Sequence, residues 1–217
     1  MPTIELFFSP GACSRVPLIA LEEAGCAYTA RPVVLSRGEH KQASYLQLNP
    51  KGKVPFLLID GEPLSENVAI LTALSRLFPK AGLLPSGSQK LELQALSTLA
   101  WFASGIHPYV TRLVMPQVVC DEASAAPRIQ AMAALMLGKQ LALLESQLAL
   151  SDWLLGDWSV ADVYAFWVWT RIQAAPMDLS AYTHLAAHAK RMQERPSVVR
   201  ALAREAATSN TSSNPPL

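Results

Sequence analysis

The sequence predicts two domains, a small α/β domain at the N-terminus and a larger all-α domain behind it. In the first 80 residues, short apolar strands alternate with helical segments and turn signals, whereas beyond residue 88 the apolar residues recur with the helical period of about 3.6. Between them lies PKAGLLPSGS, a stretch rich in Pro, Gly and Ser that is typical of a linker. We therefore expect domains at residues 1–80 and 89–207, a linker at 81–88 and a mobile tail at 208–217.

The first domain has the element order of a thioredoxin-like fold. Strands are expected at residues 3–9, 28–35, 54–59 and 62–64. Helical segments are expected at residues 14–24, in a short segment that ends near Leu48, and from Ser65 onward, where the hydroxyl can cap the helix. The resulting order, β-α-β-α-β-β-α, joins a βαβ unit to a hairpin, which is the thioredoxin-like α/β arrangement.

The second domain is predicted to be all helix. Helices are expected at residues 91–119, 128–150, 159–172, 182–194 and 197–206. The third of them begins with Ser159-Val160-Ala161-Asp162, which has the pattern of a capping box with Asp in place of Glu or Gln. Its apolar course predicts a central, buried helix.

The overall composition excludes several function classes. Hydrophobic residues make up 51% and charged residues 16% of the chain, which indicates a well-packed globular protein. Eighteen Lys and Arg against 17 Asp and Glu give a net charge of +1, so we expect no nucleic-acid partner. The N-terminus lacks a secretory signal pattern, and no apolar run reaches the roughly 18 residues of a membrane span. We therefore expect a cytoplasmic protein with no membrane partner.

The chain has three cysteines, of which Cys13 is the candidate reactive thiol. Three are too few and too scattered for a disulfide framework or a zinc site, so we expect no metal. Cys13 lies in the turn before the first helix, where unsatisfied N–H groups and the helix dipole favour a thiolate. That effect is worth only about 0.3–2 kcal/mol, so further donors are needed, with Ser14 and a histidine of the second domain as candidates. The alternative is that Cys13 is a small buried residue, which we expect of Cys26 and Cys120.

Cys13 is not part of a CxxC pair. It is followed by Ser14, Arg15 and Val16, so a resolving thiol is missing from the position where a dithiol reductase carries one. The sequence therefore favours a single thiol that works with an external thiol.

Two segments of the first domain are candidates for binding an extended, amino-acid-like ligand. A cis Pro55 at the start of the third strand would turn the backbone of Val54 toward the Cys13 turn, where its N–H and C=O can pair with a ligand. At the start of the next helix, backbone N–H groups can hold a carboxylate and Glu66 can take an ammonium group. The alternatives are an ordinary proline-rich loop and an ordinary acidic helix start.

One histidine of the second domain is a further candidate. His107 precedes Pro108 within the first long helix, where a kink is expected. The alternative is a structural histidine. His40, His184 and His188 stand in polar or helix-surface contexts, and we assign them no role.

Five segments of the chain resemble a known family when they are taken together. They are FFSPGACS, NPKGKVP, LSENVAI, SGIHPY and LLGDWSVADVYAF, and their order and spacing resemble those of bacterial glutathione transferases of the beta class over residues 3–205. The first two segments are specific for cysteine-type members, whereas the last is shared by the wider superfamily. The resemblance implies the glutathione transferase fold and a homodimeric detoxification enzyme that takes glutathione as co-substrate.

The resemblance also implies how the first domain holds glutathione. Cys13 would lie beside the glutathione sulfur and could carry glutathione as a mixed disulfide. Val54, before a cis Pro55, would pair with the cysteinyl part of the ligand. Glu66 and Asn67 would bind the γ-glutamyl end, although Asn67 stands where serine or glycine is usual.

The remaining implied site residues differ in how well they match the family. Ser104 and His107 would lie near the ligand, with His107 as the second catalytic group. Ser14 would contact glutathione, and Arg37 would replace a lysine from a loop that is shorter here. Phe8 stands where tyrosine is common, so a hydroxyl near the glutathione sulfur is missing. Cys13 must then carry more of the catalytic role.

We therefore expect an enzyme that directs the glutathione sulfur to a small hydrophobic electrophile, to a disulfide or to a peroxide. Conjugation and glutathione-dependent thiol transfer or peroxide reduction both fit, and a cysteine favours the latter. An apolar pocket for the second substrate would draw on the aromatic residues Trp101, Phe102, Tyr109 and Trp167. The alternative is a non-catalytic protein of the same fold that binds glutathione or hydrophobic ligands.

Overall fold

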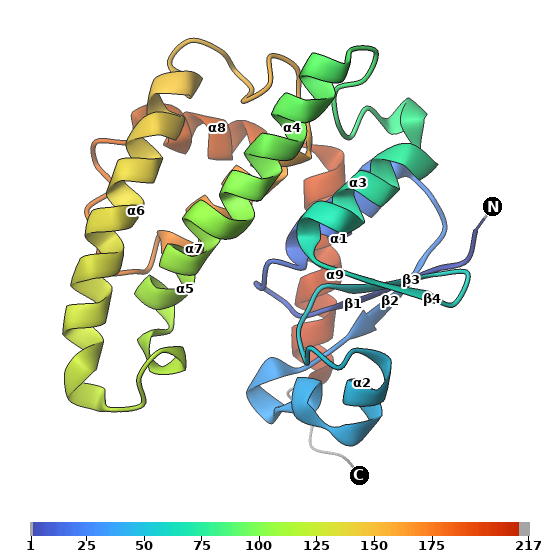
Figure 1. Ribbon diagram of the computed structural model, residues 1–217, viewed down its shortest axis with the longest axis horizontal. Helices are drawn as coiled ribbons and strands as arrows, with labels where there is room; N and C mark the ends of the chain where they lie inside the picture. Colours follow the sequence, from blue (N-terminus) through green and yellow to red (C-terminus); the bar gives the residue numbers. More distant parts are fainter. Residues whose placement is uncertain (1, 213–217) are drawn as a thin grey trace. The chain divides into compact units, whose positions relative to one another are not determined.

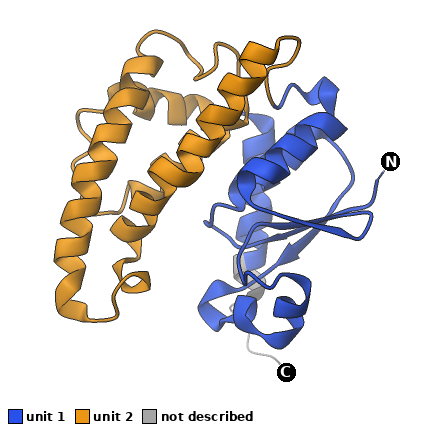
Figure 2. Ribbon diagram, in the orientation of Figure 1, with its two compact units in different colours: residues 1–83, 194–217 blue, residues 84–193 orange. Residues whose placement is uncertain are grey.

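A computed structural model describes residues 2–212 of the chain, with side chains described through residue 208. The chain forms two compact units (Figure 2). Unit 1 comprises Met1–Leu83 and Glu194–Leu217, and unit 2 comprises Leu84–Gln193. No helix of the described residues is both long and apolar enough to cross a membrane.

Unit 1 contains the predicted four-stranded sheet (Figure 1). The strands are β1 (Ile4–Phe8), β2 (Thr29–Pro32), β3 (Phe56–Ile59) and β4 (Glu62–Ser65). Their order across the sheet is β2-β1-β3-β4, with β1 parallel to β2 and antiparallel to β3, and with β3 antiparallel to β4. This small mixed sheet confirms the thioredoxin-like arrangement.

Helices cover both faces of this sheet. The helices of unit 1 are α1 (Arg15–Ala24), α2 (Ala43–Leu48), α3 (Asn67–Leu77) and α9 (Pro196–Ser212). Ile4, Leu6 and Phe8 of β1 are buried together with the apolar side of α1, as expected from the alternation of residues along a strand. Phe7 points the other way, where its ring lies 5.9 Å from that of Tyr45 in α2.

The last helix belongs to unit 1 and not to the helical unit in which the sequence placed residues 194–207. α9 packs against α1, and three acidic side chains pair with arginines across this contact. Glu22 accepts hydrogen bonds from Arg200 and Arg204, Glu23 pairs with Arg195, and Glu205 pairs with Arg15. The tail expected from residue 208 is helical as far as Ser212, and residues 213–217 lie outside the described residues.

Unit 2 is all helix, as predicted. Its helices are α4 (Gln89–Trp101), α5 (His107–Val114), α6 (Ala126–Leu148), α7 (Val160–Ile172) and α8 (Thr183–Gln193). The single helix expected at 91–119 is interrupted twice. A π-helical segment (Phe102–Ile106) separates α4 from α5, and α5 ends at Val114 because Met115 precedes a proline and leaves the helical region.

The central helix α7 begins at the predicted capping box. Asp162 Oδ2 accepts from the Ser159 N–H over 2.9 Å, and Ser159 Oγ accepts from the Ala161 N–H over 3.2 Å. Asp162 Oδ1 also pairs with His188 Nε2 of α8 at 3.0 Å. His188 is 1% exposed, so the expectation that it stands in a polar or surface context is wrong. Its ring joins α8 to the start of α7.

Candidate functional site

The Cys13 turn lies between β1 and α1, where the sequence predicted it. The chain leaves β1 through a tight turn in which the Ala12 N–H donates to the Ser9 carbonyl over 3.1 Å. Gly11 takes a φ of 73°, a left-handed conformation that glycine adopts without steric cost. Cys13 is partly buried and stands two residues before the first residue of α1, so its backbone belongs to the helix entry.

Ser14 closes this turn with its hydroxyl. Ser14 Oγ accepts from the Ser9 N–H over 3.0 Å and donates to the Ser9 carbonyl over 3.2 Å, and the residue is fully buried. The hydroxyl is thus used by the Ser9 backbone, so any donor that Ser14 offers to the Cys13 sulfur would have to come from its backbone. A short hydroxyl side chain satisfies backbone groups of its own turn first, because they are already within reach.

The thiol of Cys13 meets the start of β3. Cys13 Sγ donates to the Val54 carbonyl over 3.6 Å, and the Val54-Pro55 peptide bond is cis. The backbone of Val54 therefore does turn toward the Cys13 turn, as the sequence predicted.

The loop before Val54 is fixed by polar side chains. The Lys53 carbonyl accepts from the Tyr45 hydroxyl over 2.6 Å and from Asn49 Nδ2 over 2.8 Å. Asn49 is 2% exposed, and its Oδ1 accepts from the Lys51 N–H. A β-carbon on Gly52, which has a φ of 58°, would lie 3.0 Å from the His40 carbonyl oxygen. These contacts hold the strand start that faces the thiol.

Asn67 connects the start of α3 to the Cys13 turn. Its Nδ2 donates to the Cys13 carbonyl over 3.2 Å, and the side chain is buried. Its Oδ1 is also buried and has no hydrogen-bond partner among the described residues. Buried acceptors in native proteins normally have a hydrogen-bond partner, and a bound ligand could supply the missing donor here.

Glu66 has an unusual backbone conformation and an exposed side chain. It forms the N-cap of α3 with a φ of 74°, a region that costs a non-glycine residue about 1–3 kcal/mol. Ser65 ends β4, so the expected Ser65 cap is wrong. Glu66 Oε1 lies 2.8 Å from Lys51 Nζ in an exposed ion pair, which leaves the carboxylate accessible to solvent.

Arg37 and His40 lie on the segment before α2. Arg37 ends a 3₁₀ turn (Leu35–Arg37) and is exposed. Burial and the neighbouring charges of Lys41 and Lys53 lower the pKa of His40 below its usual 6.5. The cationic side chains of Lys41 and Lys53 therefore lie close to His40 in unit 1.

The other cysteines differ from Cys13 in their surroundings. Burial, together with the nearby charge of Glu22, raises the pKa of the Cys26 thiol above 9.0, while a backbone hydrogen bond partly offsets the shift. Cys26 is therefore a poor source of thiolate at neutral pH. Within the residues that the structure describes, no group of three or more His, Cys, Asp or Glu forms a potential metal site.

In unit 2, the predicted residues Ser104 and His107 lie at the π-helical segment. The exposed Ser104 hydroxyl donates to the Ala100 carbonyl one turn earlier over 2.8 Å. His107 Nδ1 lies 3.1 Å from the Tyr164 hydroxyl of α7, and its ring packs edge-on against Trp167 at 4.6 Å. Single-turn π segments occur frequently at functional sites.

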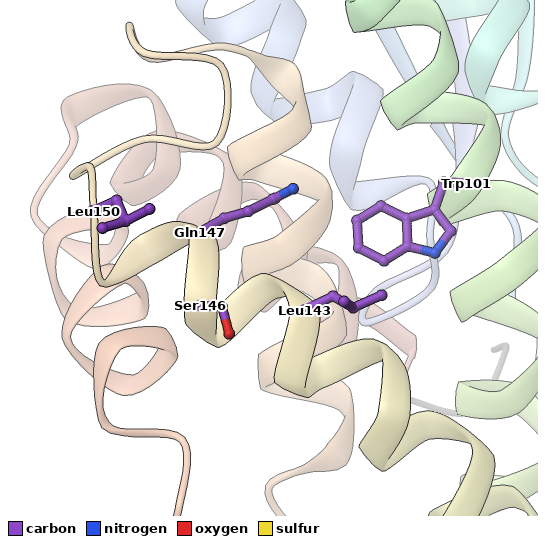
Figure 3. A pocket seen from close by; sticks show the side chains of 5 residues that line it. All are labelled: Trp101, Leu143, Ser146, Gln147 and Leu150. Carbon is purple, nitrogen blue, oxygen red and sulfur yellow. The ribbon is translucent and has the colours of Figure 1, made fainter.

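Of the four aromatic residues expected around a second-substrate pocket, one lines the pocket described here and the others have different surroundings. Phe102 and Trp167 are buried in the core of unit 2, and Tyr109 lies under Arg112. Trp101 of α4 faces α6 across a pocket of about 410 Å³ (Figure 3). The other residues that line it are Leu143, Ser146, Gln147 and Leu150.

Sequence reasoning missed three features of these sites. Asn67 is expected to bind the ligand, yet its amide nitrogen already donates to the Cys13 carbonyl. Tyr164 carries no signal of its own in the sequence, although its hydroxyl lies 3.1 Å from His107 Nδ1. The π segment keeps an apolar spacing close to that of an α-helix, so periodicity alone does not detect it.

Comparisons with known proteins agree with this architecture. Family models for the N-terminal and C-terminal domains of glutathione S-transferase match residues 10–77 and 102–196. Glutathione S-transferase GstA of Escherichia coli O157:H7 is 33% identical over 205 residues, which cover 93% of this chain and 98% of that protein.

Solved structures give the same result. The sphingomonad glutathione S-transferase complexed with glutathione is 38% identical, with a TM-score of 0.80 over 93% of this chain and 98% of that one. The bacterial beta class glutathione S-transferase of Sphingomonas chungbukensis is 34% identical, with a TM-score of 0.81 over the same shares of the two chains. The chain therefore belongs to the glutathione S-transferase family of enzymes.

Proposed function

We propose that this enzyme is a beta-class, cysteine-type glutathione transferase that carries out glutathione-dependent thiol transfer through Cys13. The observation that carries the proposal is the meeting of the Cys13 thiol with the Val54 carbonyl at 3.6 Å. It puts a partly buried thiol beside a strand start where an extended peptide can pair its backbone. Glutathione is such a peptide.

The surroundings of the thiol support glutathione as the ligand. The exposed Glu66 carboxylate can exchange Lys51 for the ammonium of a γ-glutamyl group. The buried Asn67 Oδ1 offers an acceptor to a ligand N–H. Arg37 provides a cation for a carboxylate at the other end of the peptide. The sphingomonad relative is described as complexed with glutathione, which points the same way.

The reaction proceeds as two thiol–disulfide exchanges. The Cys13 thiolate attacks the glutathione sulfur of a mixed disulfide, forms a new S–S bond and releases the other thiol as thiolate. A second glutathione thiolate then attacks the Cys13 adduct, which releases oxidised glutathione and restores the Cys13 thiolate. In sum, one disulfide is reduced to a thiol and one glutathione thiol is oxidised, so no further oxidant or reductant is needed.

Phe8 favours thiol transfer over conjugation. Conjugation requires a group that activates the thiol of glutathione itself, and Phe8 is 1% exposed in the core and carries no hydroxyl. Conjugation to a small hydrophobic electrophile stays as the second candidate, because the pocket at Trp101 offers an apolar surface. A homodimer and a cytoplasmic location belong to the same proposal, and sedimentation equilibrium tests the first.

The test compares a variant that lacks Cys13 with a control variant that lacks the other two cysteines. Cys13→Ala is expected to lose at least about 100-fold in turnover of a glutathione mixed disulfide, because the covalent route disappears. The double variant Cys26→Ala and Cys120→Ala should keep the activity of the unmodified enzyme. Full activity in Cys13→Ala would overturn the proposal.

Glutathione affinity separates the enzyme from a non-catalytic binding protein. Cys13→Ala should still bind glutathione in a calorimetric titration, since the peptide contacts come from other residues. If the unmodified protein binds glutathione but turns over neither a mixed disulfide nor a chloronitrobenzene, the binding protein is the better description.

A further inference from the structure

We propose that a pocket at the C-terminal end of α1 binds a small organic carboxylate between Arg200 and Arg204 of α9. All residues of this site belong to unit 1. None of them is part of the Cys13 turn, which lies at the other end of α1. The inference therefore goes beyond the proposed thiol transfer and does not depend on it.

The pocket combines apolar surface with charged groups. Its volume is about 390 Å³, within the range of about 300–1,000 Å³ that is usual for small-molecule sites. Leu21 and Ala27 give it apolar surface, whereas Glu22, Arg200 and Arg204 line it with charge. Such a lining suits a ligand that has a short apolar body and one charged end.

Glu22 is the buried centre of the charged cluster. Its side chain is 7% exposed and accepts from Arg200 Nε over 2.9 Å and from Arg204 Nε over 2.7 Å. The Tyr28 hydroxyl donates to the same carboxylate over 2.5 Å. Burial and the charge of Glu22 raise the pKa of Tyr28 above its usual 10, so this phenol adds no charge at neutral pH. Two arginines on one carboxylate leave the cluster with a net charge of +1.

Arg200 and Arg204 bring more positive charge than Glu22 balances. They stand four residues apart on α9 and therefore on one face of the helix, a spacing at which like charges destabilise each other. Arg200 Nη2 also donates to the Glu22 carbonyl over 2.6 Å, but the end of a helix carries only about half a negative charge. Both arginine side chains are about half exposed, so a ligand can reach them. An anion in the pocket would balance the remaining charge.

The donors of the two arginines define the class of ligand. A guanidinium group has five N–H donors, and the contacts with Glu22 use one on Arg204 and two on Arg200. The guanidinium carbon of Arg204 lies 5.0 Å from the centre of the Tyr28 ring, a contact that favours one orientation of the group. Guanidinium groups pair best with planar carboxylates. A monocarboxylate with an apolar body therefore matches both the charge and the lining of the site.

Cys26 provides a direct readout of occupancy, because its thiol lines the same pocket. The probe is benzoate, and the protein is alkylated with neutral iodoacetamide at mildly alkaline pH in benzoate or in chloride of equal ionic strength. Benzoate at ten times its Kd should slow alkylation of Cys26 by about 10-fold, since the shielded fraction follows mass action. Cys120, which belongs to unit 2, is the internal control and should react at the same rate in both salts.

Two variants of the pocket should change benzoate affinity in opposite directions. Arg204→Gln should raise the Kd by at least about 10-fold through the loss of charged hydrogen bonds, while Arg200 still pairs with Glu22. Glu22→Gln should lower the Kd by about 10-fold, because both cations then face the ligand without a competing carboxylate. Arg31→Ala is the matched control, since it removes a half-exposed arginine of unit 1 that does not line the pocket. Each Kd is taken from the ratio of Cys26 alkylation rates with and without benzoate in the same variant.

Weaker binding in both Arg204→Gln and Glu22→Gln would refute the proposal, because it would show a general disturbance of the fold and not a balance of charges. If Arg204→Gln failed to fold, the sign of the change in Glu22→Gln and the protection of Cys26 in the unmodified protein would still decide.

Related probes test the class of ligand. Benzamide has the shape of benzoate without its charge and should give no protection of Cys26, and inorganic phosphate should protect less than benzoate at equal ionic strength. Equal protection by benzamide would indicate a purely apolar pocket, and equal protection by phosphate would indicate a site for the bare anion. Either result, or the absence of protection by benzoate, would overturn the assignment to an organic carboxylate.

Discussion

The amide nitrogen of Asn67 donates to the backbone carbonyl of Cys13 over 3.2 Å, which joins the start of α3 to the turn that carries the thiol. Asn67→Asp keeps the shape but replaces the donor by an acceptor that faces the carbonyl. We expect the free energy of unfolding to fall by about 1–3 kcal/mol and the KM for glutathione to rise. Urea denaturation and a glutathione titration measure the two effects, and an unchanged stability would contradict the role of this contact.

Ser14 is expected to stabilise the same turn through its backbone contacts. Ser14→Ala removes both hydrogen bonds to Ser9 in a fully buried place, which should cost about 1–3 kcal/mol of unfolding free energy. Ser104→Ala is the control, since this exposed hydroxyl bonds only within its own helix and its loss should stay within about 0.5 kcal/mol. Similar losses for the two variants would show that the Ser14 contacts do not matter.

The ion pair between Arg15 and Glu205 ties α9 to the helix that follows the thiol. Both side chains are largely buried and their nearest atoms lie 2.6 Å apart. Glu205→Ala should lower the free energy of unfolding by about 3 kcal/mol, because a buried cation loses a carboxylate. Arg31→Ala, which breaks the exposed pair with Glu5, should cost no more than about 1 kcal/mol. Thermal unfolding of the two variants tests the contrast.

Glu22 should make stability depend on pH in the acidic range. Burial raises the pKa of its carboxyl, but hydrogen bonds from Tyr28, Arg204 and Arg200 outweigh burial, so the pKa lies below 4.5 in the folded chain. A lowered folded pKa gives stability that is present above about pH 4.5 and is lost as the pH falls through the folded value.

Glu22→Gln isolates this contribution. The difference in unfolding free energy between the unmodified protein and the variant should be largest near pH 7 and shrink as the pH falls below about 4.5. Its size at neutral pH should be about 1–3 kcal/mol, since the carboxylate accepts several charged hydrogen bonds. A difference that stays constant from pH 7 to pH 3 would contradict the assignment.

The strands and most helices could be predicted from the sequence because they follow from local patterns. The strand that ends at Phe8 and the hairpin at Asp60 carry signals in adjacent residues. The capping box at Ser159 does so as well, and the structure has it at the predicted place. A proline at a strand start left open whether the bond before Pro55 is cis, and the structure has the cis form that the family resemblance implied.

What the sequence could not predict depends on contacts between distant residues. An amphipathic helix such as α9 looks the same whichever core it packs on, and the pairing of Glu22 with Arg200 and Arg204 is one of the contacts that attach it to α1. The contacts of the Ser14 hydroxyl with the Ser9 backbone depend on the geometry of the turn, which the sequence does not show. The positive φ of Glu66 leaves no mark in a single sequence.

The most direct test of the account is to locate the glutathione adduct by mass spectrometry. The unmodified protein is treated with oxidised glutathione without reductant, digested under acidic conditions and mapped for peptides that carry one added glutathione. We expect modification at Cys13, with Cys26 and Cys120 left as free thiols. Modification at Cys26 or Cys120 with an unmodified Cys13 would contradict it.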